Sequence, residues 1–504
     1  MPEILRSLIV VLFIAFTVFH FGKKTFVSMG MSEADFVLRR NAWLIITLAA
    51  FLTHNFWIFC AVTTGAVIYA AKKDSSKLSL FITLLFAVPL FSVEISGLGI
   101  INYFFALDYF RLLSLLLLFP AFLTLRRLPI SAAFGSLLPD KFLLAYILIG
   151  LVLQAPVDTA TNLARTAFYD FMDIFLPYYV ASRALNNTKA VHDFCASFVM
   201  AATFLAVAGV AEYLKGWLLY STLASAMSAV WGYGNYMARG GGVRALVSTG
   251  HPIVFGYVCA VALGIYFAIK NNVENKNTRT LITLVLSAGL FASVSRGPWL
   301  GAALVAIVFV ALGPKPWVAL PKMVFAFVSC GLILLATPYS DTIIDLLPFV
   351  GSINAETIEF RNNLIDNSIA VIAKNPFFGS FNALATDEME ELRAGGIIDV
   401  VNSYIALALT GGLVTVTFFV GFFVSIVLQL FLVKRKSTLT NVGNDIVRSI
   451  IAVILGIMFI IFTVSSITLV PIVYWLVGGV GVGVITAASR PSKSGANFTG
   501  FIAV

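Results

Sequence analysis

Four arginines stand in short polar stretches between long apolar runs, and their chemistry suits the binding of phosphate. Arg239 and Arg244 lie in a glycine-rich stretch, Arg296 in the tight sequence Ser295–Pro298, and Arg361 in a longer polar segment. A guanidinium stays protonated at working pH and makes planar, paired hydrogen bonds to phosphate oxygens. Each arginine alone could equally be a structural turn residue or a side chain that snorkels to the membrane surface. If they converge on one face, the group would suit a diphosphate.

The composition shows to which class of protein these arginines belong. The chain has 504 residues, of which 60% are hydrophobic and only 11% charged, and its mean hydropathy is +0.97. These values exclude a cytosolic enzyme, a disordered chain and a disulfide-rich secreted domain, and they indicate a polytopic membrane protein. The net charge of +9 does not require nucleic acid as a partner, because cytoplasmic loops of membrane proteins collect lysine and arginine. No Walker A or Rossmann glycine pattern supports ATP- or NAD-dependent chemistry, and no cofactor is expected.

Apolar runs long enough to cross a bilayer recur along the whole chain. We therefore predict an all-α polytopic membrane protein with about 12–14 transmembrane helices and two extended periplasmic segments. The predicted spans lie near 4–22, 42–71, 78–99, 107–125, 140–157, 164–182, 190–214, 251–270, 279–295, 298–313, 318–337, 401–433, 448–468 and 470–488. The run at 42–71 could be one long helix or two short ones.

Basic clusters predict the sidedness of the spans. Five loops share one side when the spans are counted, and the positive-inside rule makes that side cytoplasmic; they carry Lys72, Lys73 and Lys77, Arg126 and Arg127, Lys270, Lys276 and Arg279, Lys315 and Lys322, and Lys434–Lys436. The count also places both termini there, although the basic loop 23–41 fits only if 42–71 forms two spans. The chain is therefore predicted to begin with transmembrane helices over 1–214, which the first outer segment follows at 215–250. More transmembrane helices follow at 251–337, and then a large outer loop at 338–400 that contains an interfacial helix. The last part, 401–504, consists of the C-terminal helices and the tail.

Several acidic residues lie in or near the predicted spans, and we expect them to pair with arginines inside the bundle. Asp170 and Asp173 share a helical face, and Arg111, Arg165 and Arg183 are the expected partners. Intramembrane carboxylates are also candidate proton or cation sites, so a transporter or flippase is an alternative function. The long polar stretches lie in two outer segments, and the sequence does not divide into two related halves as many transporters do. Both features favour an enzyme over a transporter.

Three blocks of residues resemble the bacterial O-antigen ligase and polymerase family, which includes Wzy-type polymerases. The first runs from Arg244 to His251-Pro252, and the second is Ser293–Leu300, which contains a Ser-Arg-Gly signature. The third combines Arg361-Asn362-Asn363, Asn375–Gly379, Asn402-Ser403-Tyr404 and Gly411-Gly412. The resemblance covers residues 190–430 and implies a GT-C-like membrane fold.

The resemblance implies a glycosyltransferase of the bacterial inner membrane with its active site facing the periplasm. Its donor would be an undecaprenyl-diphosphate-linked glycan, and its acceptor a lipid-linked repeat or the lipid A–core. Membrane lipids and a chain-length regulator would be further partners. Arg244, Arg296 and Arg361 would hold the diphosphate and stabilise it as it leaves, without a metal. Arg239, His251, Ser295 and Tyr404 are the neighbouring substrate-binding candidates.

One position departs from the pattern of the family's ligases. They usually carry a histidine at the start of the helix after the large outer loop, and this chain has Asn402 there. Asparagine cannot accept a proton at neutral pH, although it can orient an acceptor hydroxyl. Glu212 and Asp366 are the alternative candidates for a base. The missing histidine favours a polymerase over a ligase.

Overall fold

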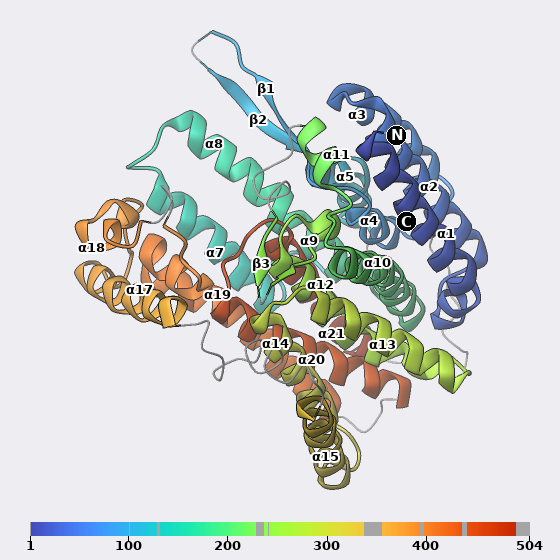
Figure 1. Cartoon of the computed structure of the whole chain (residues 1–504). Helices are drawn as coiled ribbons and strands as arrows, with labels where there is room; N and C mark the ends of the chain where they lie inside the picture. The colour runs from blue at the N-terminus through green and yellow to red at the C-terminus, as the bar shows by residue number, and fades with distance from the viewer. Residues whose placement is uncertain are drawn as a thin grey trace.

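Apolar helices form nearly all of the structure (Figure 1). The computed structural model describes residues 2–99, 101–128, 132–227, 236–239, 241–336, 355–393, 398–435 and 441–489. Parts of the predicted outer segments, at 228–235, 337–354 and 394–397, and the tail from 490 onward therefore lie outside the described residues. The prediction of an all-α polytopic membrane protein is confirmed.

The N-terminal half contains ten α-helices, two π-helical turns and one hairpin within the described residues. Their bounds are α1 Glu3–Met29, α2 Glu33–Thr53, α3 Phe56–Ala71, α4 Lys77–Leu85, β1 Ser92–Ser96, β2 Tyr103–Asp108, α5 Tyr109–Leu113, η1 Ser114–Leu118, α6 Phe119–Leu125, α7 Leu138–Gln154, α8 Ala160–Tyr169, η2 Asp170–Phe175, α9 Leu176–Ala184 and α10 Thr188–Lys215.

The remainder carries the outer segments and the central helices. Its elements are α11 Ser221–Ala226, β3 Ala238–Arg239, β4 Gly242–Val243, η3 Val247–Thr249, α12 Pro252–Ile269, η4 Lys270–Asn272, α13 Lys276–Ala292, α14 Arg296–Ala311, α15 Pro316–Leu335, α17 Ala355–Lys374, η6 Ala383–Ala385, α18 Asp387–Glu390, α19 Ser403–Arg435, α20 Asn441–Thr463 and α21 Leu469–Ser489.

Fewer helices than predicted have the length of a full span. Eight of the described helices are long and apolar enough to cross a membrane, and three apolar helices are shorter. The predicted span at 78–99 is instead α4 followed by strand β1. Pro89 lacks the N–H that a continuing helix needs, and the alternation of Val93 and Ile95 with polar residues suits a hairpin. The predicted span at 164–182 lies in one helical run formed by α8, η2 and α9, whose middle part, Asp170–Phe175, is π-helical.

The run at 42–71 forms two helices, which is one of the two alternatives that the sequence leaves open and the one that suits the basic loop 23–41. His54 adopts a left-handed conformation with φ 47°, and the Asn55 side chain caps α3 through the N–H groups of Trp57 and Ile58. At the start of α1, the Trp217 indole donates a hydrogen bond of 3.0 Å to Glu3. The N-terminus therefore lies beside the first outer segment, and not with the basic loops.

The loops that carry the predicted basic clusters meet at one end of the bundle, which we call the basic face. The fully buried Arg39 of α2 binds Asp74, in the loop after α3, and Asp193 of α10, each at 2.7 Å. Asn272, after α12, donates to the carbonyl of Met29 at the end of α1. These contacts involve the ends of five helices, α1, α2, α3, α10 and α12. The alternating helices then bring residues 236–250, 293–298 and 399–404 to the opposite face.

Buried carboxylates pair with arginines, partly as predicted. Asp173 receives a hydrogen bond of 2.6 Å from Arg111, which confirms that pairing. Arg183 binds Asp140 at 2.7 Å, and Asp193 binds Arg39 at 2.7 Å. Arg165 stacks on Tyr103 and donates to its carbonyl. These pairs give the charges inside the bundle a structural role.

Candidate functional site

The first outer segment and the turn before α14 hold Arg244 between them. Arg244 is 8% exposed, and its Nη2 donates a hydrogen bond of 2.8 Å to Ser295 Oγ. Its Nε donates to the carbonyl of Ser293 at 3.3 Å. The backbone strengthens this junction, since Ala245 N–H donates to the carbonyl of Ala292 at 3.0 Å. Two motif blocks about 50 residues apart in the sequence therefore form one unit.

Arg239 contacts the same turn, and the charges of two other arginines act on it. Its Nη1 donates to the carbonyl of Val294 at 3.3 Å. Burial lowers the pKa of Arg239, and the charges of Arg296 and Arg361 lower it further. Burial, assisted by Arg239, also lowers the pKa of Arg244 to about 10. Arg239 and Arg244 both donate to the turn that leads into Arg296, and the charge of Arg361 acts on Arg239. Like charges grouped in this way favour a multivalent anion between them.

The Ser-Arg-Gly turn owes its shape to close backbone packing. Val294 has φ 45°, a strained conformation for a β-branched residue. A Cβ at Gly297 would approach Thr463 Oγ1 to 2.5 Å, and one at Gly256 would approach Ser293 Oγ to 2.6 Å. The turn is thus seated between α12 and α20. Arg296 is the first residue of α14, so the positive end of that helix adds to the field of the arginines.

Arg361 reaches the cluster from α17, together with a carboxylate that the sequence analysis did not single out. Arg361 is exposed, yet partial desolvation lowers its pKa, while the nearby Asp399 acts in the opposite direction. Asp399 is exposed and accepts a hydrogen bond of 2.8 Å from Ser465 Oγ. The only sequence signal for Asp399 is its position three residues before Asn402.

His251 lies at the edge of the cluster and is neutral at neutral pH. Burial, assisted by Arg244, lowers the pKa of His251 to about 4. Its Nδ1 accepts a hydrogen bond from Ile253 N–H at 3.2 Å, which caps α12. The proton of the neutral ring therefore resides on Nε2. In this arrangement His251 offers a hydrogen-bond donor and not a base.

Glu212 is an anchor for the first outer segment. It is fully buried, and its carboxylate accepts hydrogen bonds of 2.9–3.0 Å from the N–H groups of Leu219, Leu246 and Val247. These donors hold both ends of the segment against the end of α10. With its oxygens committed to backbone donors, the carboxylate is not directed at the arginine cluster.

We expect Glu212→Gln to destabilise the protein. The amide NH₂ would face backbone donors, so at least one charge-assisted hydrogen bond would be lost at a cost of about 2–3 kcal/mol. Thermal unfolding of the purified protein in detergent measures the effect, with Glu274→Gln in an exposed loop as the matched control. Equal melting temperatures for the two variants would contradict the anchoring role.

The other three candidates lie around α17 and the start of α19. Asn402 is 8% exposed, and its Oδ1 accepts from Tyr404 N–H at 2.9 Å and Ile405 N–H at 3.2 Å, so it caps α19. The Tyr404 hydroxyl donates to the carbonyl of Met458 at 2.9 Å, inside the bundle. Asp366 is exposed on α17, roughly 140° around the helix from Arg361. Asp366 and Tyr404 therefore point away from the cluster.

A backbone crossing, which we call the clasp, fixes α17 to α19. Gly412 breaks α19 with φ 65° and ψ −175°. The loop 376–379 lies in that break, and the N–H groups of Leu413 and Ser380 donate to the carbonyls of Pro376 and Leu409, each at 2.8 Å. A Cβ at Gly412 would approach the Phe377 carbonyl to 2.3 Å, and one at Gly379 would approach Gly412 N to 2.6 Å. Two parts of the third motif block, Asn375–Gly379 and Gly411-Gly412, are thus packed together by their backbones. This contact sets the position of α17 and of Arg361.

A bundle of apolar helices, eight of them long enough to cross a membrane, defines an integral membrane protein. Residues 281–420 match the family model described as O-antigen ligase. This segment includes Arg296, Arg361, Asn402 and the clasp, and the match confirms the resemblance to the O-antigen ligase and polymerase family. It supports an O-antigen ligase-type glycosyl-transferring membrane protein. A comparison with curated proteins finds no match.

Proposed function

We propose that this protein is a Wzy-type polymerase, which transfers an undecaprenyl-diphosphate-linked oligosaccharide onto an acceptor glycan at the periplasmic face of the bacterial inner membrane. The observation that carries the proposal is the gathering of Arg239, Arg244, Arg296 and Arg361 at the end of the bundle opposite the basic face. The positive-inside rule assigns the basic face to the cytoplasm and hence the arginine cluster to the periplasm.

The proposed reaction is the transfer of a sugar from a diphosphate that the arginines hold. An acceptor hydroxyl attacks the anomeric carbon of the donor sugar, and the bond from that carbon to the phosphate oxygen breaks. Attack from the side opposite the leaving group inverts the anomeric centre. The guanidinium groups and the positive end of α14 stabilise the negative charge that develops on the departing diphosphate. The arginines supply this stabilisation without a metal.

Asp399 is our candidate for the group that accepts the proton of the attacking hydroxyl. It is an exposed carboxylate beside Arg361, and Ser465 donates to one of its oxygens. Asn402, at the position where ligases of the family carry histidine, has its oxygen occupied by the cap of α19. Its free amide group can donate to an acceptor hydroxyl but cannot take its proton.

We expect Asp399→Asn to slow glycan assembly by a factor of about 10²–10⁴, the usual contribution of a general base. Asp387→Asn, at an exposed residue of the same outer segment, serves as the control and should keep normal assembly. The measurement is the rate of polymer formation from lipid-linked repeats by the purified protein. Unchanged rates for Asp399→Asn would remove Asp399 from the mechanism.

The polymerase and ligase alternatives make different products accumulate. The match to the family model supports either function, whereas Asn402 at the usual histidine position favours a polymerase. In a deletion strain, loss of a polymerase leaves single repeats attached to the lipid A–core on a gel of surface glycans. Loss of a ligase leaves long chains on the lipid carrier. Unaltered glycans would contradict both functions.

A further inference from the structure

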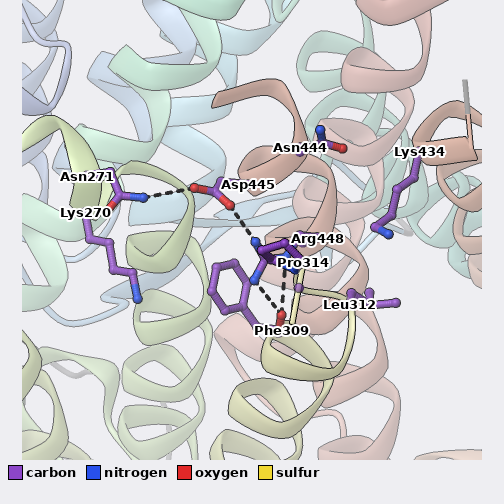
Figure 2. Close-up of a pocket in the computed structure, with 10 residues that line it drawn as sticks. Lys270, Asn271, Phe309, Leu312, Pro314, Lys434, Asn444, Asp445 and Arg448 are labelled. Carbon is purple, nitrogen blue, oxygen red and sulfur yellow. Dashed lines mark hydrogen bonds and ion pairs between the residues drawn. The ribbon is translucent and has the colours of Figure 1, made fainter. Parts of the chain in front are cut away.

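A cavity on the basic face lies on the opposite side of the bundle from the arginine cluster. Its volume is about 640 Å³, and it opens between the ends of α12, α14, α19 and α20 (Figure 2). Its charged lining residues are Lys270, Lys434, Arg448 and Asp445, which sum to a net charge of +2 (three cations less one carboxylate). Such a cavity attracts an anion.

Asp445 and Arg448 form a fixed base for this cavity. Arg448 Nη1 donates to Asp445 at 2.7 Å and Nη2 donates to the Phe309 carbonyl at 2.8 Å. Asn271 donates to the other oxygen of Asp445 at 3.0 Å. A Cβ at Gly313 would approach Arg448 Nη2 to 3.1 Å, so this glycine leaves room for the guanidinium. The carboxylate is therefore satisfied by Arg448 and Asn271.

The two lysines supply the charge that remains available. Lys270 and Lys434 lie on either side of Arg448 (Figure 2). Lys270 Nζ lies 5.0 Å and 5.4 Å from the ring centroids of Phe267 and Phe309. Among the residues that the structure describes, neither lysine has a carboxylate within salt-bridge distance. Two ammonium groups are thus free to bind phosphate oxygens.

The surroundings of the cavity suit a lipid. The cavity is at the ends of membrane-spanning helices, where phospholipid headgroups lie. In the turns just before it, Ile307 of α14 is 45% exposed, and Leu428 and Leu432 of α19 are each 58% exposed. These exposed side chains give the two helices that border the cavity apolar surface along which acyl chains can lie. A soluble phosphate compound would make no use of that surface.

We propose that this cavity binds the headgroup of an anionic phospholipid, whose phosphate contacts Lys270 and Lys434 while its acyl chains lie along α14 and α19. Basic pockets between membrane helices on the cytoplasmic side commonly bind anionic headgroups. The proposal is independent of the glycan chemistry at the other face.

The test is the binding of phosphatidylglycerol to the purified full-length protein, followed by its thermal stability and by native mass spectrometry. Phosphatidylcholine and inorganic phosphate are the comparison probes. We expect phosphatidylglycerol to raise the melting temperature saturably and more than phosphatidylcholine. Lys270→Gln/Lys434→Gln should weaken its apparent affinity about thirtyfold, given the usual contribution of each basic residue near a charged bilayer. Lys434→Arg, which keeps the charge, should bind nearly as well as the unmodified protein.

The controls separate the alternatives. Lys276→Gln, an exposed lysine of the same face that does not line the cavity, should bind as the unmodified protein does. Equal melting temperatures of all variants in phosphatidylcholine establish that they fold; if the double variant fails this check, the Lys270→Gln and Lys434→Gln single variants are measured instead. Equal stabilisation by the two phospholipids, or unchanged binding by the glutamine variants, would overturn the proposal. The same saturable effect from inorganic phosphate would assign the site to free phosphate and overturn the lipid.

Discussion

Arg296→Ala is expected to reduce glycan assembly by a factor of about 10²–10³, the usual effect of removing one group that stabilises a developing oxyanion. Arg296 starts α14, and its charge acts on Arg239 within the cluster. The loss should appear mainly in the turnover rate, because the charge on the diphosphate grows as the sugar departs. Lysine at this position keeps the charge but not the paired geometry, so Arg296→Lys should recover only part of the rate.

The rate of polymer formation by the purified protein measures this effect, with surface glycans of a complemented deletion strain as a second readout. Arg393→Ala is the matched control, because Arg393 is an exposed arginine of the outer segment that pairs with Glu390. Equal membrane levels of the variants must be verified by immunoblot. Full assembly by Arg296→Ala would refute the arginine mechanism.

Gly412→Ala is expected to lower the stability of the protein by about 3 kcal/mol or more. The backbone of Gly412, with φ 65° and ψ −175°, belongs to a region that only glycine occupies without a cost of about 1–3 kcal/mol. The added Cβ would also approach the carbonyl group of Phe377 to 2.3 Å. Since the Cβ is fixed directly to the backbone of α19 and its neighbour is the backbone of the loop 376–379, the loop must move away from α19, and α17 with Arg361 must follow.

Thermal unfolding in detergent and polymer formation together test this prediction. Gly150→Ala is a suitable control, because this glycine lies in α7 with nothing within 4 Å of its added Cβ. That variant should be slightly stabilised, since alanine is favoured over glycine in a helix by about 1 kcal/mol. Equal melting temperatures for Gly412→Ala and the unmodified protein would show that the clasp contributes no stability.

The sequence predicts the helical membrane fold well, because apolar composition and length are sufficient to identify most spanning helices. It fails where a local backbone signal interrupts an apolar run. Pro89 ends α4 before the hairpin, within a run where the sequence predicts a single span. For 42–71 the sequence leaves one helix or two open, and the turn at His54-Asn55 selects two. The side of every residue before that turn depends on this choice.

For the candidate site, charge was a better guide than hydrogen-bonding capacity. The four arginines could be named from the sequence, because a guanidinium between apolar runs is a suitable ligand for phosphate. The environments of Glu212 and Asn402 could not, because their partners are backbone N–H groups that leave no trace in residue types. Asp399 was missed for a related reason, since its neighbours Arg361 and Ser465 come close only in the folded chain.

The buried arginine of α2 has a consequence for the biosynthesis of the protein. Arg39 is fully buried against Asp74 and Asp193, which are made 35 and 154 residues later. A charge at a membrane helix is costly until it is paired. Asp74 is available to Arg39 as soon as α3 has been made. Asp193 becomes available only when α10 has been made, after all of the intervening helices. We therefore expect an early stage of synthesis in which Arg39 holds α2 to the end of α3 through Asp74 alone, before Asp193 of α10 completes the ion-pair cluster.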